Sequence, residues 1–388
     1  MSQARIYLDH AATTPMRDEV AEAMRPYFFE NGYNASSLHA EGRRARAAID
    51  DARARVAAVL RCKPSEIVFC SGGTEADNLA VIGSARARGP RGRIVASAIE
   101  HHAVLRAVES LRAEGYGAQF LPVDEGGVVD AERFGAALDA QTLLAAVMYA
   151  NNEIGTIEPV AELAGIARER GVIFACDAVQ AAGALPLDVG MLGVDLLALS
   201  GHKFGGPKGA GALFVREGTP IVATLHGGGQ ERGRRSGTED VAGIVGFAVA
   251  LELAESERAA YVRRTAGLRD RLEATLLAIP GAKGNGKAAA RLPNISSVSL
   301  SGIAVEPLLI ALDLEGIAVS AGSACATGSL EPSHVMAALR DRSERGDRRE
   351  ATLRFSLGRK TTEAEIDRVG AVVPILVARQ RESAAAPV

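Results

Sequence analysis

Short apolar runs alternate with longer segments rich in alanine, arginine and glutamate between about residues 44 and 215. Apolar runs of this length, bounded by glycine or polar residues, are typical of buried strands, whereas the longer segments have a helical pattern. Strands that alternate with helices are the signature of a mostly parallel sheet. The pattern therefore predicts an α/β unit, in which helices such as 41–60 and 74–88 cover the faces of the sheet.

The pattern changes after this unit. A Gly-rich stretch at 226–237 precedes a long helical segment of about 239–278, and strand-like runs follow at 295–300, 317–320 and 353–356. The whole chain of 388 residues also exceeds the length that one hydrophobic core usually supports. We therefore expect two domains, the second a smaller α+β unit.

Polar residues follow five of the predicted strands where each strand ends. They are Ser71-Gly72-Gly73-Thr74 after 66–70, Glu100-His101-His102 after 93–97, Asn151-Asn152-Glu153 after 143–149, Asp177 and Gln180 after 172–176, and Ser200-Gly201-His202-Lys203 after 195–199. In open α/β sheets, ligands bind in the crevice beyond the carboxyl ends of the strands. One such group is a cap or turn residue as often as not, but their recurrence predicts a single active-site crevice.

Lys203 is the residue in this set with the most specific chemistry. A lysine amine can form a Schiff base, and pyridoxal phosphate (PLP) needs such a lysine together with an acidic partner for its ring nitrogen. The alternative is a surface lysine that closes a turn, since most lysines are solvated. Lys203 alone does not decide between the two.

The turn from Ser71 to Thr74 also has two interpretations. Its glycines let the backbone approach a ligand closely, and the N–H groups at the start of the following helix attract a phosphate. Plain helix capping would explain Thr74 as the cap and Asp77 as the partner in a capping box, but it does not require Gly72 and Gly73.

Composition excludes several classes of protein. The chain has 47 acidic and 44 basic residues, without the basic excess of a nucleic-acid-binding protein. It has no run of eighteen apolar residues and no apolar signal core at its N-terminus, so we expect a cytoplasmic protein without a membrane partner. The four cysteines show neither a CxxC pair nor zinc-like spacing with histidine, which argues against a disulfide framework and a structural metal.

Beyond these patterns, the chain resembles the cysteine desulfurases of the NifS/IscS type, which are PLP-dependent enzymes of the class V aminotransferase group. The matching segments run in family order and are 7–15, 71–78, 100–101, 151–155, 177–180, 200–203, 227–233, 235–238, 323–325 with 329–334, and 354–358. Two departures could alter the substrate mouth: Asn34 is not followed by the usual proline, and His10 replaces the usual asparagine or tyrosine.

The resemblance implies a PLP-dependent transferase of fold type I. In that fold a large PLP-binding domain, here 15–260, contains a mostly parallel (mixed) seven-stranded sheet. A smaller α+β C-terminal domain, here 1–14 with 261–388, carries the catalytic cysteine loop at 320–333.

The resemblance also implies roles for individual residues. Lys203 would hold pyridoxal 5'-phosphate and move protons at the substrate, and Asp177 would keep the pyridine nitrogen protonated. His101 would stack on the ring and act as an acid and base, while Asn152 and Arg354 would bind the substrate carboxylate. The remaining cofactor contacts would be Gln180 to the ring hydroxyl, and Gly73, Thr74, Ser200, His202 and the other subunit's Thr238 to the phosphate, which implies a homodimer.

Cys325 would be the acceptor of sulfur. It lies in a run of small residues, 320–329, which we interpret as a mobile tether, and Ser333 is placed to cap a helix at 334–339. An unperturbed thiol is only a few per cent thiolate at pH 7, so it would need a base nearby before it can attack sulfur. The other three cysteines, Cys62, Cys70 and Cys176, are expected to be buried and inert.

We therefore expect an enzyme that converts L-cysteine to L-alanine and leaves the sulfur as a persulfide on Cys325. An iron-sulfur scaffold protein or another thiol acceptor would then take the sulfur. Two alternatives are another class V enzyme, such as an aminotransferase or a selenocysteine lyase, and a non-catalytic subunit. The first would have no need of a cysteine on a flexible loop, and loss of Lys203, Asp177 or Cys325 would have indicated the second.

Overall fold

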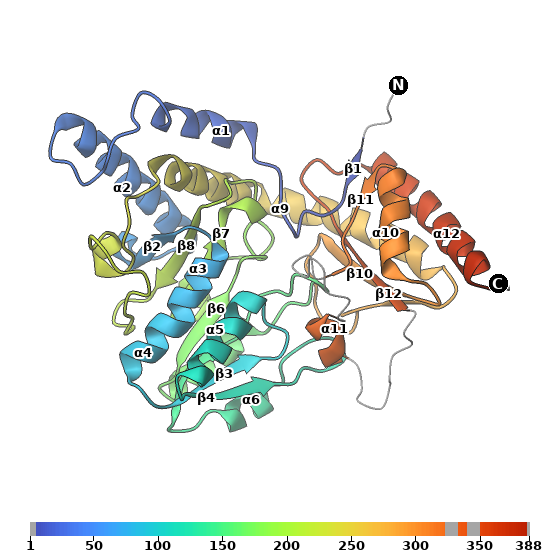
Figure 1. Ribbon diagram of the computed structural model, residues 1–388, viewed down its shortest axis with the longest axis horizontal. Helices are drawn as coiled ribbons and strands as arrows, with labels where there is room; N and C mark the ends of the chain where they lie inside the picture. Colours follow the sequence, from blue (N-terminus) through green and yellow to red (C-terminus); the bar gives the residue numbers. More distant parts are fainter. Residues whose placement is uncertain (1–4, 323–332, 340–349, 386–388) are drawn as a thin grey trace.

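The computed structural model describes residues 5–322, 333–339 and 350–385 of the chain. Figure 1 shows a large sheet with helices around it on one side and a smaller group of strands and helices on the other, joined by the long helix α9. Helix α9, Val241–Leu277, confirms the long helical segment expected at about 239–278.

The large sheet has seven strands in the order β2-β8-β7-β6-β5-β3-β4. Strand β8 runs antiparallel to the other six, so the predicted mixed, mostly parallel sheet is confirmed. The strands are β2 (Ile67–Cys70), β3 (Arg93–Ser97), β4 (Gly117–Leu121), β5 (Thr142–Ala146), β6 (Ile173–Asp177), β7 (Leu196–Ser200) and β8 (Gly211–Val215).

Both faces of this sheet are covered. Along β2, Ile67 and Phe69 lie in the core that includes residues of α9, whereas Val68 and Cys70 point to the opposite core. This alternation follows from the two-residue period of a strand. A sheet buried on both faces explains why its strands read as continuous apolar runs instead of alternating ones.

The helices around the large sheet follow the predicted pattern with one difference. The expected helix 41–60 is α2, but the expected helix 74–88 consists of α3 and α4 joined by a π-helical turn, Leu79–Gly83. The helices are α1 (Asp18–Met24), α2 (Ala40–Leu60), α3 (Gly73–Asn78), α4 (Ser84–Arg88), α5 (His102–Ala113), α6 (Ala131–Ala137), α7 (Val160–Glu169) and α8 (Val189–Leu192).

The smaller unit contains an antiparallel sheet in the order β12-β10-β9 and a parallel pair, β1 with β11. Its core contains Ile6 and Leu8 from the start of the chain, together with residues of α9, β10, β12 and α12. The elements are β1 (Ile6–Tyr7), β9 (Ala282–Gly284), β10 (Ile295–Ser301), β11 (Ile317–Ala318), β12 (Glu350–Ser356), α10 (Val305–Leu314), α11 (His334–Leu339) and α12 (Glu363–Ala385).

Two features concern the chain as a whole: its helices as candidates for membrane spans, and its division into domains. Among the helices of the described residues, none has the length and apolar character needed to cross a membrane. The division into 15–260 and 1–14 with 261–388 stays a prediction, although the packing of Ile6 and Leu8 with the C-terminal strands is consistent with it.

Candidate active site

A cavity of about 260 Å³ lies where several strands of the large sheet end. Ten of the residues predicted for the site line it: Gly73, Thr74, His101, Asn152, Asp177, Gln180, Ser200, His202, Lys203 and Arg354. Strands β2, β3, β5, β6 and β7 run in the same direction, so residues that follow them meet at one edge of the sheet. Two predicted residues are not among these ten: Thr238 is exposed and does not line the cavity, and Cys325 lies outside the described residues.

Lys203 follows β7 in a short 3₁₀ turn, Gly201–Lys203. Its Nζ atom donates hydrogen bonds to the carbonyl oxygens of Ala11 at 2.7 Å and Ala12 at 2.9 Å. Gln180 Nε2 donates to the same Ala11 oxygen at 3.0 Å. The lysine is therefore a half-buried residue of the cavity wall, and the alternative of a solvated turn lysine was wrong.

Asp177 ends β6 inside a cluster of ionisable groups. Carboxylate oxygens of Asp77 and Asp177 and a ring nitrogen of His101 lie within 4.8 Å of one another. Burial raises the pKa of Asp177, while the charges of His101 and Lys203 and the N–H of Val179, 2.9 Å from Oδ1, oppose that rise. The pKa of Asp77 is raised well above its ordinary value by burial, and the charge of Asp177 adds to this rise. The two carboxyl groups therefore share a buried site in which burial raises the pKa of both.

The start of α3 differs from the prediction. Its N-cap is Gly72, with φ of 155°, so Thr74 lies inside the helix, and no side chain caps it. A Cβ atom at Gly73 would lie 2.7 Å from Cγ2 of Val179, so the close packing of the two segments requires glycine there. The alternative of plain helix capping by Thr74 and Asp77 was therefore wrong, because Gly72 is the N-cap and the Asp77 carboxyl lines the cavity.

His101 is the N-cap of α5, and burial lowers the pKa of its imidazole. The neighbouring His102 packs against His334 of α11, with ring centroids 4.6 Å apart. Both His102 and His334 line the cavity. The first turn of α11 is thereby placed beside the end of β3.

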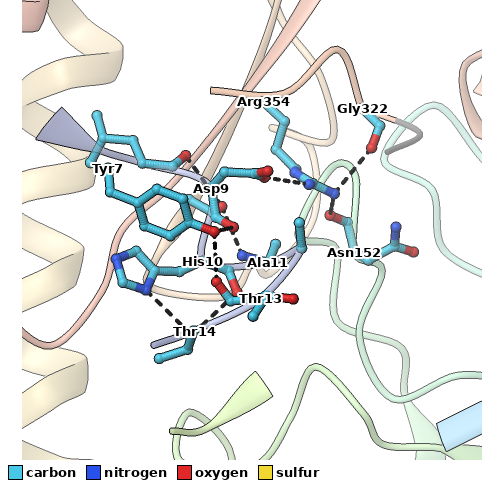
Figure 2. A network of polar contacts seen from close by, with 12 residues as sticks. Tyr7, Asp9, His10, Ala11, Thr13, Thr14, Asn152, Gly322 and Arg354 are labelled. Atoms are coloured by element: carbon cyan, nitrogen blue, oxygen red, sulfur yellow. Dashed lines mark hydrogen bonds and ion pairs between the residues drawn. The ribbon is translucent and has the colours of Figure 1, made fainter. Parts of the chain in front are cut away.

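Arg354 comes from β12 in the smaller unit and is 1% exposed. Figure 2 shows its guanidinium between three acceptors: the carbonyl oxygens of Asn152 at 2.8 Å and Gly322 at 3.0 Å, and Oδ1 of Asp9 at 2.8 Å. Among the described residues, its Nε atom has no hydrogen-bond partner. Arg354 thus joins the smaller sheet to the N-terminal segment and to the loop after β5.

The phosphate-binding candidates Gly73, Thr74, Ser200 and His202 also line the cavity. Ser200 is 2% exposed. Its Oγ atom lies beside Gly73, 3.8 Å from the place that a Cβ atom would take if residue 73 had a side chain. The Nδ1 atom of His202 is 3.0 Å from Thr13 Oγ1. Burial is the largest cause that lowers the pKa of His202 to about 4, so its imidazole is neutral at pH 7.

Sequence reasoning missed some of the residues that line the cavity. The carbonyl groups of Ala11 and Ala12 carry no signal in a sequence, because any residue has a carbonyl group. Asp77 and His334 were assigned to helix capping and to a helix start, and only their place in the fold brings them to the cavity. His10, which we expected at the substrate mouth, lines a neighbouring cavity of about 250 Å³ that shares Gln180 and Lys203 with the first.

The cysteines other than Cys325 match their prediction in part. Cys70 and Cys176 are buried, and Cys62 is half-buried. Burial raises the pKa of the Cys62 thiol to about 12. Burial also raises the thiol pKa of Cys70 and Cys176 well above the ordinary value, so none of the three is a thiolate at neutral pH.

Comparisons with known proteins agree with this geometry. The family Aminotransferase class-V matches residues 6–369. The protein named Cysteine desulfurase IscS from Methanosarcina thermophila is 47% identical over 377 residues, which cover 97% of this chain and 93% of that protein. The match thus includes the large sheet, the cavity and most of the smaller unit.

Solved structures give the same result. A structure titled NIFS-LIKE PROTEIN has a TM-score of 0.88 and 36% identity, and the match covers 97% of this chain and 100% of that one. A structure titled SspA in complex with cysteine has a TM-score of 0.79 and 33% identity, covering 91% and 98% of the two chains. The chain therefore belongs to the class V aminotransferases, a family of PLP-dependent enzymes, and within it to the cysteine desulfurases.

Proposed function

We propose that this protein removes sulfur from L-cysteine, forms L-alanine, and passes the sulfur through Cys325 to a thiol acceptor. The observation that carries the proposal is the meeting of Lys203, Asp177 and His101 in one cavity with Arg354. A lysine amine, a buried carboxylate and an imidazole are the groups that PLP chemistry requires. An arginine supplies the planar fork that suits a substrate carboxylate.

The cavity residues fit pyridoxal 5'-phosphate. Burial raises the pKa of Asp177, and the neighbouring positive charges and the Val179 N–H only partly offset that rise. A protonated ring nitrogen beside Asp177 would stabilise its negative charge further. A side chain at position 73 would clash with Val179, so the first residue of α3 is a glycine. The backbone N–H groups at the start of this helix are therefore not covered by a side chain of residue 73. The first N–H groups of that helix have no acceptor within the helix and can bind a phosphate together with Ser200 and His202.

When bound, this cofactor supplies an electron sink for the carbon skeleton of the amino acid. Lys203 would hold the cofactor through its amine and, once released, move a proton at the substrate α-carbon. The Ala11 and Ala12 carbonyl oxygens bind its ammonium group and so hold the lysine beside the cavity. Gln180, which donates to the same Ala11 oxygen, would also reach the ring hydroxyl.

The substrate carboxylate would be bound by Arg354 and Asn152. Arg354 already donates to Asn152 O, Gly322 O and Asp9 Oδ1, so its position is determined before substrate arrives. Its Nε atom, which has no partner among the described residues, is the group available for a further acceptor. His101, which lines the same cavity, would exchange a proton with the substrate.

The thiolate of Cys325 would then attack the sulfur of the bound cysteine. An S–S bond forms, the Cβ–S bond breaks with its electron pair left on the substrate carbon, and a proton added there gives alanine. A thiolate of an iron-sulfur scaffold protein or of another thiol acceptor would then attack the outer sulfur of this persulfide, so that the acceptor becomes the persulfide and Cys325 leaves as a thiolate. Among the other cysteines, Cys62 has its thiol pKa raised to about 12, mainly by burial, so it is a poor competitor for this step.

We further propose a homodimer. Segment 28–38 exposes several large apolar side chains, among them Phe29 at 79% and Leu38 at 90%. A cluster of exposed apolar residues of this kind is typical of an interaction surface. A second copy that covers it would also give the exposed Thr238 a route to the phosphate of the neighbouring site. Sedimentation of the purified protein tests this assignment.

The test of function compares alanine formation from L-cysteine by the parent and by Cys325→Ala, with a thiol reductant as acceptor. We expect activity in the parent, loss of at least 100-fold in Cys325→Ala, and parental activity in the control Cys62→Ala. A PLP-loaded parent that forms no alanine would contradict the proposal. Release of selenide from selenocysteine, or amino transfer to a 2-oxo acid, would then identify which other class V reaction it catalyses.

A further inference from the structure

Two residues that are eleven positions apart in the sequence meet at one carboxylate, that of Glu153. Ser333 Oγ donates a hydrogen bond to Glu153 Oε2 at 2.5 Å. Gly322 lies against the same oxygen, since a Cβ atom at residue 322 would be 2.9 Å from it. Glu153 is 3% exposed and lines the cavity. Neither capping nor the proposed chemistry accounts for this arrangement.

The contact at Gly322 depends on glycine for two reasons. Its φ is +95°, in the region that favours glycine, and the Glu153 carboxylate occupies the space where a side chain would begin. Its carbonyl oxygen accepts a hydrogen bond from Arg354 Nη1, which also donates to the carbonyl oxygen of Asn152, the residue before Glu153. Gly322 is therefore bound by Arg354 and packs against Glu153.

The contact at Ser333 has a defined direction. Ser333 Oγ accepts hydrogen bonds from the backbone N–H groups of Val335 at 3.1 Å and Met336 at 3.3 Å, which confirms it as the cap of α11. A hydroxyl group has a single proton to donate, and here that proton points to Glu153. Burial, the largest cause, raises the pKa of Glu153, while the hydrogen bond from Ser333 and the charges of Arg354 and His102 oppose that rise.

We propose that Glu153 is a positioning residue for sulfur transfer, because its carboxylate accepts a hydrogen bond from Ser333 and packs against Gly322, the two residues that flank the segment containing Cys325. This inference rests on the proposed function. Three residues of extended chain span at most about 11 Å, so an anchor at Gly322 limits the region in which a thiol three residues later can act. A displacement of about 1 Å at a reacting group can cost about 100-fold in rate.

The proposal separates two steps of the reaction. Binding of cofactor and substrate depends on Lys203, Asp177 and Arg354, none of which contacts Glu153 through a described hydrogen bond. Sulfur transfer depends on where the thiol is held. Loss of Glu153 should therefore leave the first step unchanged and slow the second.

The experiment uses the PLP-loaded enzyme and the variants Glu153→Ala, Glu153→Gln and Ser333→Ala. We expect each variant to give the parental absorbance change of the cofactor at the parental KM for L-cysteine. The kcat for alanine should fall about 10- to 100-fold in Glu153→Ala and less in Glu153→Gln, whose amide oxygen can still accept from Ser333. The double variant Glu153→Ala/Ser333→Ala should be no slower than Glu153→Ala, because both changes break the same contact.

Glu158→Gln is the matched control. Glu158 is another buried glutamate, 2% exposed, but its carboxylate accepts from the N–H of Val129 and does not line the cavity. We expect parental kcat in this control. If Glu153→Ala does not fold, Ser333→Ala alone carries the test.

Two results would overturn the inference: a parental kcat in Glu153→Ala and Ser333→Ala, or a loss that already appears in the absorbance change. A parent that forms no alanine at all contradicts the proposed function instead. The two failures are therefore distinguishable.

Discussion

The Nδ1 atom of His101 accepts a hydrogen bond from the backbone N–H of Ala103 at 3.1 Å. An imidazole nitrogen that accepts from an N–H group carries no proton, so the neutral ring has its proton on Nε2. Burial lowers the pKa of His101, which favours this neutral form. The helix cap therefore presents His101 to the cavity as a hydrogen-bond donor, which restricts the acid and base role that the family resemblance implies.

Replacement of His101 separates its two roles. His101→Asn keeps a good N-cap, so we expect the unfolding free energy to change by less than about 0.5 kcal/mol, whereas kcat falls by about 100-fold or more. His101→Ala should lose the same activity and about 1 kcal/mol of stability in addition. Thermal unfolding and alanine formation by both variants check this. Equal stability of the two variants would contradict the capping role.

Gly73 is predicted to be intolerant of a methyl group. In Gly73→Ala the new Cβ would meet Val179 Cγ2 at 2.7 Å, so the start of α3 and Val179, which both line the cavity, must move apart. We expect the Kd for PLP to rise at least 10-fold, which titration by absorbance would measure.

Gly165→Ala in α7 is the control for this prediction. Nothing lies within 4 Å of a Cβ atom at that position, and alanine in a helix interior is about 0.5–1 kcal/mol more favourable than glycine. Parental PLP affinity in Gly165→Ala, with a slightly higher Tm, is the expected result. Equal PLP affinity in Gly73→Ala and Gly165→Ala would contradict the claim that the contact between residue 73 and Val179 requires glycine.

Arg53 and Glu231 form a buried bidentate ion pair, with N–O distances of 2.7 and 2.8 Å. Glu231 also accepts from the N–H of Phe69, so the pair holds the Gly-rich segment against β2. Arg53→Met leaves the Glu231 charge buried without its partner, and we expect a loss of about 3–5 kcal/mol.

The double variant Arg53→Met/Glu231→Leu should be more stable than Arg53→Met, because no unpaired charge remains. Urea denaturation followed by circular dichroism gives the order of the three proteins. A double variant that is no more stable than Arg53→Met would contradict the explanation by an unpaired buried charge.

Glu158 is predicted to make stability depend on pH. Burial is the largest cause that raises its pKa from 4.5 to about 8. Since the folded state binds this proton more tightly than the unfolded state, the contribution is fully present below pH 4.5 and is lost as pH rises to 8. At about 1.4 kcal/mol per pH unit, the upper limit of this loss is about 4–5 kcal/mol.

Glu158→Gln imitates the protonated side chain at every pH. The Tm of the variant relative to the parent should therefore increase steadily between pH 5 and pH 8. Parallel Tm curves over that range would show that Glu158 does not titrate there.

The sequence by itself determined the α/β alternation, the order of most elements and the strand ends at which Lys203, Asp177 and His101 lie. The physical reason is that a buried parallel strand needs a continuous apolar run, and all parallel strands place their carboxyl ends at one edge. A residue directly after such a run is therefore assigned to the crevice without knowledge of the packing.

Tertiary structure alone decided the contacts between distant segments. The carbonyl groups that bind Lys203 belong to Ala11 and Ala12, and Arg354 is bound to Asp9 across 345 positions. Backbone carbonyls have no sequence signal, and the direction of a helical carboxyl such as Asp77 depends on how the glycine turn before it packs on Val179. The same holds for Glu153, whose two partners meet only because the smaller unit packs against the end of the large sheet.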